Sequence, residues 1–424
     1  MWTIQGALMS LTLLAGAGAV ALDGPFSNYQ TKISNSPRNP VYPIDSVDKM
    51  ETDAMPNVDM WMHKKTVANK NNNCTLENAA IRKEWSDMSE TERQAYTAAL
   101  KCLMKLPAKS DKTRFSGAVS RYDDFVAFHM THAMQLHDNV HLFGAHKYFV
   151  WLFEKALRDE CGYTGYQPYM NYDRYAEDPG NSPLLNGNAS SMGGNGAPDP
   201  SYKGVPQYGR TPNIIKSGGG GGCVTEGPFA DMVVNLGPTS MATGSKLPKN
   251  PKADGTGPNP RCLRRDVNRN AAMGATNAKA YSLLQNTEMN KFYDQLLGSP
   301  VPKNDPYPWG IHTAGHYIAA VDPGGDPNTS PGDPLFYFHH TALDRLWWIW
   351  QMQDPTGRLY DVPYSNATMP MPMKGRSTDT QDAQNDTNPL ETMVDMEWLG
   401  PPIKLFETHD QLGGNGGQFC YIYV

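Results

Sequence analysis

The histidines of this chain are concentrated in segments with helical character, and their placement limits the possible folds more than any other feature. Five of the 11 histidines lie between residues 125 and 157, where apolar residues recur at three- and four-residue spacing. Three of these five, His129, His137 and His146, are separated by seven and then eight intervening residues. Such ordered spacing on a helical segment indicates that the three imidazoles belong to one site.

A second group of histidines lies in the C-terminal half. His312 and His316 form an H-x-x-x-H pair, which on a helix places both imidazoles on one face. A third histidine follows in "DPLFYFHHTALDRLWWIW", after a turn rich in proline and glycine. The chain thus offers two sets of three imidazoles. We expect a mainly α-helical fold in which a four-helix bundle holds both sets in its core, with long Gly/Pro-rich loops and a few short strands.

The ligand types limit the metal that such a bundle can hold. A carboxylate-bridged di-iron site needs Glu-x-x-His motifs, and the sequence has none. Structural zinc usually takes cysteine, and no CxxC pair is present. Ligation by imidazoles alone suits copper or catalytic zinc. Two adjacent copper ions can each give up one electron, so that together they can bind and reduce dioxygen.

The rest of the chain divides into helical and irregular stretches. Helical patterns occur at about 77–105, 120–160, 276–297 and 333–353. Residues 161–275 are rich in Gly, Pro, Asn and Ser, so we expect ordered loop with little regular structure. Such a long loop is unusual unless it is functional or cross-linked, and three cysteines lie in or beside it. We expect residues 22–424 to form a single domain.

Several features predict export from the cell. Residues 1–21 are apolar, end in Ala-Val-Ala and read as a secretory signal peptide. No other segment is long and apolar enough to span a membrane. The six cysteines can form up to three disulfides in an oxidising compartment. Asn-X-Ser/Thr sequons, which are candidate glycosylation sites, begin at Asn73, Asn188, Asn328, Asn366 and Asn385.

The charge of the chain argues against one class of partner. The formal net charge is −6, and no run of lysine or arginine occurs. A protein that binds nucleic acid usually carries a basic patch or stripe. We therefore expect no nucleic-acid partner. The sequence leaves the oligomeric state open.

Two stretches match known signatures. "HDNVHLFGAHKYFVWLFE" and "DPLFYFHHTALDRLWW" resemble the first and second copper signatures of the type 3 copper proteins, within them the short secreted fungal tyrosinases and catechol oxidases. Connecting segments such as "CVTEGPFADMVVNLGP" and "NPRCLRRDVN" are similar to the same group. The resemblance runs from about Cys74 to the C-terminus, and it implies a binuclear centre of two copper ions.

The resemblance also implies the metal ligands. The expected ligands are His129, His137 and His146 at CuA, and His312, His316 and His340 at CuB. His340 is chosen over His339 because the family's ligand stands four residues before an aspartate, here Asp344. Neighbouring residues on a helix diverge by about 100°, so we expect His339 to be packed or hydrogen-bonded instead.

Four further histidines have weaker claims. His132 and His141 lie three and four residues after His129 and His137, which makes them rival ligands outside the family spacing. His63 and His409 belong to no motif, and we expect them on the surface.

Some residues depart from the family pattern. Ala145 and Lys147 flank His146 where the family usually has an aromatic residue and an arginine. Asn171 replaces an aspartate that is expected to orient a ligand imidazole, a supporting role that the resemblance also gives to Asp344. The chain ends in "CYIYV", where the family has a tyrosine motif, so we expect no C-terminal lid domain.

The function implied by the resemblance is oxidation of o-diphenols to o-quinones by dioxygen, with a small phenol and O2 as the partners. Hydroxylation of monophenols needs a base, and tyrosinases often have asparagine directly after the first CuB histidine. Here that catalytic position is Thr313, so we expect weak monophenol hydroxylation. The alternatives are a true tyrosinase, an o-aminophenol oxidase and a non-enzymatic oxygen carrier.

Overall fold

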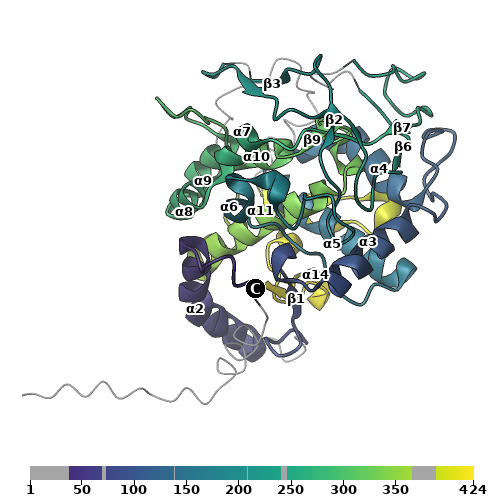
Figure 1. The fold of residues 1–424 in the computed structure, drawn as a ribbon. Helices are drawn as coiled ribbons and strands as arrows, with labels where there is room; N and C mark the ends of the chain where they lie inside the picture. Colours follow the sequence, from purple (N-terminus) through teal and green to yellow (C-terminus); the bar gives the residue numbers. More distant parts are fainter. Residues whose placement is uncertain (1–37, 69–72, 138, 208, 240–245, 365–387) are drawn as a thin grey trace, which may run out of the picture.

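The computed structural model describes residues 38–68, 73–137, 139–207, 209–239, 246–364 and 388–424. The expected signal peptide, residues 1–21, and the sequons at Asn366 and Asn385 lie outside the described residues. None of the helices within these ranges has the length and apolar character needed to cross a membrane. The described chain is mainly helical, as predicted, with a few short strands (Figure 1).

Four helices form the bundle at the centre of the molecule: α4 (Arg121–Leu136), α5 (Leu142–Cys161), α10 (Ile311–Tyr317) and α11 (Leu335–Met352). Helix α5 contacts both α4 and α11, and α10 contacts α11. All 18 residues of α11 are buried. A helix that is buried along its whole length belongs in the interior, so α11 lies within the core and the other elements surround it (Figure 1).

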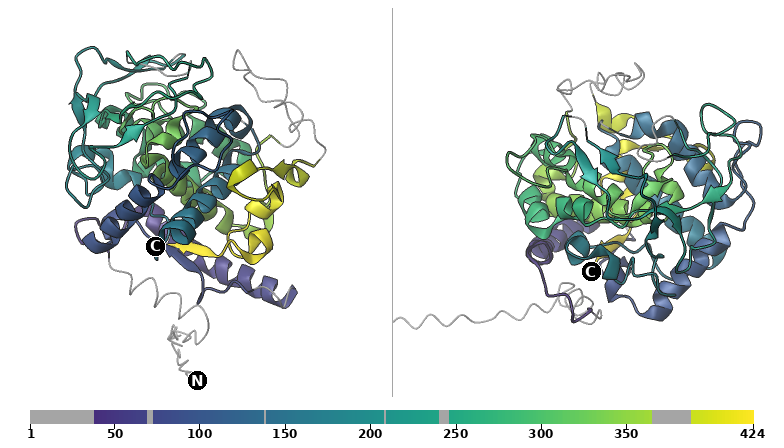
Figure 2. Two further views of the ribbon diagram at one scale, coloured as in Figure 1. Left: turned by 90° about the vertical axis from the view of Figure 1, so that its right-hand side faces the viewer. Right: turned by 45° about the horizontal axis from the view of Figure 1, so that its top comes forward.

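The remaining helices pack around this bundle. Helix α3 lies against α5, while α2 and α8 lie against α11 and against each other. Their bounds are α2 Ser46–Ala68, α3 Glu90–Leu103, α6 Tyr172–Ala176, α7 Arg269–Ala272, α8 Asn277–Leu284, α9 Met289–Leu297, α12 Pro355–Arg358 and α14 Gly414–Gly417. The C-terminal segment returns to the bundle beside α5, as the yellow ribbon shows in Figure 2.

The first predicted helical stretch, 77–105, is too long. Helix α3 begins only at Glu90, because Ser89 and Glu92 cap its start reciprocally. The preceding residues instead form strand β1 (Ala80–Arg82), which pairs in parallel with the C-terminal strand β12 (Tyr421–Tyr423). Local periodicity misses this strand because its partner is distant in the sequence.

Two other predicted stretches are each divided into two helices. In 120–160, α4 ends at Leu136 because His137 has an extended backbone (φ −111°, ψ 156°), and α5 begins at Leu142. The stretch 276–297 contains α8 and α9. The stretch 333–353 is one helix, α11, as predicted. The break after α4 matters for the site, because it lets His137 turn away from the α4 axis.

Residues 161–275 contain little regular structure, as predicted. Strands β2, β5, β8 and β9 form a four-stranded antiparallel sheet in that order, and β3–β4, β6–β7 and β10–β11 are separate antiparallel pairs. The strands are β2 Gly196–Pro198, β3 Gly204–Pro206, β4 Ile214–Lys216, β5 Gly221–Val224, β6 Val233–Val234, β7 Arg261–Cys262, β8 Arg264–Arg265, β9 Ala320–Asp322, β10 Met393–Val394 and β11 Ile403–Lys404.

Ion pairs and disulfides hold this irregular layer in place. Arg261 bonds Asp322 through two nitrogens, and the buried Arg265 does the same with Asp333 just before α11. Paired hydrogen bonds of this kind fix orientation as well as distance. All six cysteines are paired, as Cys74–Cys420, Cys102–Cys161 and Cys223–Cys262. The expected three disulfides are therefore present, and one of them cross-links the loop layer itself.

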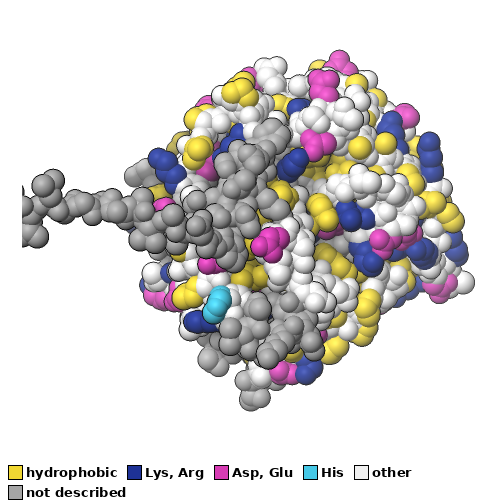
Figure 3. Space-filling view, turned by 90° about the horizontal axis from the view of Figure 1, so that it is seen from below, with side chains coloured by type: hydrophobic (Ala, Val, Ile, Leu, Met, Phe, Trp, Pro, Cys, Tyr) yellow, Lys and Arg dark blue, Asp and Glu magenta, His cyan; other side chains and the backbone are white. Residues whose placement is uncertain are grey.

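On the face shown in Figure 3, basic and acidic side chains are interspersed, and no basic stripe crosses the described part of that face. Apolar side chains are scattered among them rather than gathered in one patch.

Candidate metal centre

The first group of histidines forms a cluster inside the bundle. His129 lies in α4, His137 directly follows that helix, and His146 lies in α5. One ring nitrogen of each lies within 4.8 Å of the nitrogens of the other two. The ring centroids are 5.2 Å apart for His129 and His137 and 4.8 Å apart for His137 and His146. The structure thus brings together the three residues that the sequence singled out.

The backbone holds each ring of this cluster through its Nδ1 atom. Nδ1 of His137 lies 2.7 Å from the carbonyl oxygen of Ala133, and Nδ1 of His146 lies 2.7 Å from that of Leu142, each one turn earlier. Nδ1 of His129 lies 2.8 Å from the carbonyl oxygen of Asn328. A carbonyl only accepts, so Nδ1 carries the proton and Nε2 keeps a lone pair. This is the tautomer that a metal ligand needs.

The Nε2 atoms of His129 and His146 are buried, and neither finds a hydrogen-bond partner in the described chain. A buried polar atom without a partner costs about 1 to 3 kcal/mol. A metal ion between the rings would remove that cost by accepting the lone pairs. The cluster therefore has the chemistry of an imidazole site for copper or catalytic zinc.

The second cluster contains four histidines. One ring nitrogen from each of His312, His316, His339 and His340 lies within 4.8 Å of the others. Nε2 of His312 and Nε2 of His316 are 3.3 Å apart, one turn from each other on α10. The Nε2 atoms of His339 and His340, on α11, are buried without a hydrogen-bond partner among the described residues. Both neighbours on α11 therefore reach the same cluster, although only one was expected to do so.

The two clusters adjoin each other. The rings of His146 and His340 are stacked with their centroids 4.2 Å apart, and those of His137 and His312 are 6.1 Å apart. Phe336, which is buried, packs against rings of both clusters, at 5.2 Å from His129 and 4.2 Å from His340. The sequence analysis missed Phe336. Its position one turn before His340 on a buried helix was the available signal.

Burial keeps these imidazoles neutral. Desolvation lowers the pKa of His129 and that of His312 to about 3 each, with the neighbouring His137 adding to both shifts. Desolvation, again the largest cause, holds the pKa values of His316 and His340 well below the usual value. Crowding several imidazoles at a largely buried site disfavours the charged form of each. The rings are thus ready to bind a metal at neutral pH without first losing protons.

The two rival histidines of the first group bond elsewhere. A ring nitrogen of His132, Nε2, lies 3.2 Å from a carboxylate oxygen of Glu397, and its ring stacks on Phe128. Nε2 of His141 lies 2.9 Å from the hydroxyl of Thr392. Neither ring belongs to a cluster of potential metal ligands in the described chain.

The expectation for His409 is wrong. This residue is 2% exposed, and its ring packs against Trp347 and stacks on Tyr360. Desolvation lowers its pKa to about 3. Its neighbours come from distant parts of the chain, so local sequence gave no sign of the burial. His63 is exposed on α2, as expected.

Asp344 lies behind the second cluster in a buried charge network. Lys147, the residue after His146, places its Nζ 3.0 Å from Oδ1 of Asp344. The hydroxyl groups of Tyr421 and Tyr423 donate to Oδ2 of the same carboxylate. Arg82 also reaches this oxygen, at 3.5 Å. Asp344 therefore joins α11 to α5 and to the C-terminal strand, and these contacts hold the helices rather than an imidazole.

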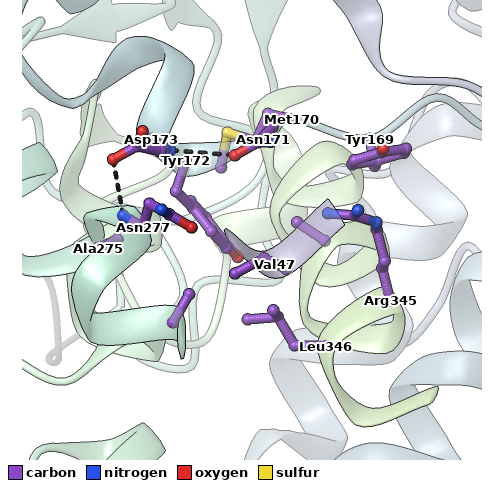
Figure 4. A pocket seen from close by; sticks show the side chains of 12 residues that line it. Val47, Tyr169, Met170, Asn171, Tyr172, Asp173, Ala275, Asn277, Arg345 and Leu346 are labelled. Atoms are coloured by element: carbon purple, nitrogen blue, oxygen red, sulfur yellow. Dashed lines mark hydrogen bonds between the residues drawn. The ribbon is translucent and has the colours of Figure 1, made fainter. Parts of the chain in front are cut away.

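The side-chain hydrogen bonds that Asn171 makes in the described chain go to residues other than the histidines. Its amide nitrogen donates to a carboxylate oxygen of Asp45, and its side-chain oxygen accepts from the backbone N–H of Asp173 at the start of α6. Figure 4 shows the bond between Asn171 and Asp173 and a second one, from the backbone N–H of Asn277 to the Asp173 carboxylate. The residue that reaches the histidines is its neighbour Tyr172, whose hydroxyl lies 2.7 Å from Nδ1 of His339.

Thr313 lies directly after His312 on α10 and is half-buried. On an α-helix, consecutive side chains point about 100° apart. Thr313 therefore points in a different direction from His312 and is partly accessible.

Comparison with known proteins agrees with this geometry. Residues 119–353, more than half of the chain, match the family model described as the common central domain of tyrosinase. The tyrosinase-like protein orsC of Emericella nidulans is 41% identical over 300 residues, which cover 68% of this chain and 78% of that protein. Tyrosinase P of Aspergillus terreus is 34% identical over 348 residues, which cover 81% and 92%.

A solved structure is also similar. It is that of a polyphenol oxidase from Thermothelomyces thermophila, which is 32% identical and has a TM-score of 0.76. The likeness covers 89% of this chain and 97% of that one. The likeness therefore extends over most of the chain.

Proposed function

The chain belongs to the tyrosinase family and is an oxidoreductase with a dicopper centre, and from this premise we propose that it oxidises o-diphenols to o-quinones with dioxygen. The observation that carries this proposal is the pair of adjoining imidazole clusters. Each o-diphenol loses two electrons and two protons. Two such oxidations reduce one O2 to two molecules of water.

We assign three ligands to each copper: His129, His137 and His146 to the first, and His312, His316 and His340 to the second. Three facts support the fit, namely the close-set ring nitrogens, the buried Nε2 atoms without partners in the described chain, and the Nδ1 bonds that orient the first set. Copper bound there supplies the one-electron couples that reduce dioxygen. Purified protein should contain about two coppers per chain.

The side chains around the clusters give the substrate its orientation. Imidazole faces are flat and apolar, so a phenol ring can stack on them in an offset or edge-to-face arrangement. Phe336 is buried and packs against rings of both sets, so it adds an apolar surface beside them. Oxidation of the diphenol removes two protons as well as two electrons, so a proton acceptor must lie near the bound substrate.

Thr313 is the residue that we propose sets the balance between diphenols and monophenols. It follows His312 on α10 and is half-buried. Its hydroxyl can hydrogen-bond, but it lacks an amide that would hold and polarise a water molecule. Deprotonating a phenol of pKa about 10 should therefore be the harder step. A catechol is more acidic and suffers less.

Initial rates on matched monophenol and diphenol pairs test this proposal. We expect diphenol oxidation to be much faster in the wild type, and Thr313→Asn to raise the monophenol rate relative to the diphenol rate. Thr91→Asn, at an exposed position on α3, is the matched control and should leave the ratio unchanged. If the wild type handles both classes equally, the true tyrosinase becomes the better description, as the name of the relative Tyrosinase P would suggest.

An oxygen carrier would share the copper ligands but would not oxidise diphenols catalytically. Catechol-dependent oxygen uptake by the copper-loaded protein separates the two. Uptake that continues over many equivalents of catechol supports the oxidase. Reversible oxygen binding without quinone formation would contradict it.

We also propose that the protein is secreted as a single domain. The three disulfides of the structure support an oxidising compartment, and the apolar first 21 residues support a signal peptide. Mass spectrometry of the protein recovered from culture medium would test both the cleavage and the location.

A further inference from the structure

We propose that Asp326 and Thr239 are positioning residues for the first copper site, because together they fix the backbone carbonyl that orients the ring of His129. This inference rests on the proposed function, since it concerns one ligand of the same dicopper centre. Both residues lie outside the helices that carry the histidines. Neither belongs to the two copper signatures of the sequence.

His129 differs from the other two ligands of its cluster in what holds its ring. The Nδ1 atoms of His137 and His146 each bond to a carbonyl oxygen four residues earlier in the chain. Nδ1 of His129 lies 2.8 Å from the carbonyl oxygen of Asn328, which is 199 residues away. The local backbone therefore supplies the acceptor for two of the rings, whereas the third ring depends on a distant loop.

The loop that carries this acceptor runs from β9 to α11 and lies along α4. Its short 3-10 helix, Ser330–Gly332, packs against α4, and the hydroxyl of Tyr122 donates to the carbonyl oxygen of Pro331 at 2.8 Å. Tyr122 and His129 are seven residues apart on α4, so they lie on the same face of the helix. The loop thus meets α4 at two positions about two turns apart, and the second of them is a metal ligand.

The peptide group between Asn328 and Thr329 is fixed from the side opposite to His129. Its N–H, which belongs to Thr329, donates to the backbone carbonyl oxygen of Asp326 at 3.1 Å. A trans peptide group is planar and directs its N–H and C=O in opposite directions. A bond on the N–H side therefore fixes the direction of the C=O that faces the His129 ring.

The buried carboxylate of Asp326 holds the same segment through its side chain. It accepts from the backbone N–H of Asn328 at 3.0 Å, and from the backbone N–H and the hydroxyl of Thr239 at 2.7 and 2.9 Å. The hydroxyl has one proton, which it donates to the carboxylate, so its oxygen can accept from the side-chain amide of Asn328 at 3.0 Å. The three residues thus form a closed set of hydrogen bonds around Asn328.

These contacts affect the metal site through the tautomer of one ring. Hydrogen bonds to an ionised carboxylate are about twice as strong as neutral ones, so the side chain of Asp326 makes the loop stiffer than its backbone bonds alone would. If the Asn328 carbonyl moves, Nδ1–H of His129 loses its acceptor. The proton can then shift to Nε2, the nitrogen that a metal needs free. Only the first copper should feel this change, because the other two rings of its cluster have acceptors in their own segment.

Nitrogen NMR of the metal-free protein reads the tautomer directly. In the wild type at neutral pH, we expect Nδ1 of His129 to carry the proton. Thr239→Val removes the hydroxyl and keeps the shape of the side chain, so it should give a mixture of tautomers at His129 and leave His137 and His146 unchanged. Thr239→Ser, which keeps the hydroxyl, should restore the wild-type signal. A wild type with the proton on Nε2 of His129 would overturn the proposal without any variant.

Copper release to a chelator gives a second reading. We expect Thr239→Val to release one of its two coppers at least about 10-fold faster than the wild type, and the other at the wild-type rate. Thr256→Val is the matched control, because Thr256 is a buried threonine of the same irregular layer that donates to Asp254 instead. Asp326→Asn removes the charge from the other side of the bond and should act in the same direction as Thr239→Val.

The outcomes separate this inference from the proposed function. Release from Thr239→Val at the rate of Thr256→Val would overturn the positioning role and leave the six ligands as assigned. Equally faster release of both coppers would also overturn it, since that result indicates a general loosening of the bundle. A wild type that does not bind two coppers would instead contradict the ligand assignment. The tautomer of His129 is measured without metal and does not depend on that assignment.

Discussion

The buried ion pair between Lys147 and Asp344 joins two helices of the candidate metal centre. Lys147 follows His146 on α5, and Asp344 lies one turn after His340 on α11. Their charged atoms are 3.0 Å apart, and the side chains are 0% and 5% exposed. Breaking this pair should therefore disturb both stability and the spacing between the two clusters.

The size of the effect follows from the geometry. At 3.0 Å and an effective dielectric constant of about 20, two unit charges attract by about 5.5 kcal/mol. Removing one partner of a buried pair costs about 3 to 5 kcal/mol, because the other charge stays buried. Arg82 and Glu154 belong to the same network, so Lys147→Met leaves it with a net charge of −1 and Asp344→Asn leaves it with +1. The double variant is neutral again.

Urea unfolding of the disulfide-intact protein measures the coupling. We expect the double variant to be more stable than the sum of the single effects predicts, by about 2 to 3 kcal/mol. The matched control is the Lys155–Asp159 pair on the same helix, whose side chains are 51% and 56% exposed. Its cycle should give a coupling below about 0.5 kcal/mol. A coupling below about 1 kcal/mol for the buried pair would refute the reasoning.

Two further outcomes follow from buried groups. His409 has a pKa of about 3 in the folded protein and about 6.5 when unfolded, so its contribution to stability is complete above pH 6.5 and falls as the pH drops toward 3. At pH 5 the free energy of unfolding is lower by about 2 kcal/mol because of this residue. Between pH 7 and pH 5, His409→Phe should therefore lose less stability than the wild type in urea unfolding. Equal losses would show that the residue does not titrate as described. In a secreting host, peptide mapping should find glycans at the exposed Asn73 or Asn188 but none at Asn328, whose amide nitrogen donates to Thr239 at 3.0 Å; a glycan there would contradict the observed bond.

Local sequence was informative wherever the physical cause is itself local. The 3.6-residue period of apolar side chains indicated the bundle helices, and glycine and proline indicated the irregular layer, because both act through the backbone of adjacent residues. The H-x-x-x-H pair on α10 placed His312 and His316 together for the same reason, since one helical turn separates them. The exact ends of the helices were less predictable, because caps such as Ser89 depend on single side chains.

Contacts between distant segments decided the rest. The carbonyl of Asn328 that orients His129, the hydroxyl of Tyr172 at His339 and the burial of His409 each join residues that are far apart in the sequence. The periodicity of apolar residues does not predict such long-range contacts. Six cysteines can be joined into three disulfides in 15 ways, and the fold selects the one that is observed. Spacing along the chain gave the kind of ligand and the helices that carry it. The backbone one turn earlier orients the rings of His137 and His146, whereas contacts between distant segments orient His129 and bring the rings together in two clusters.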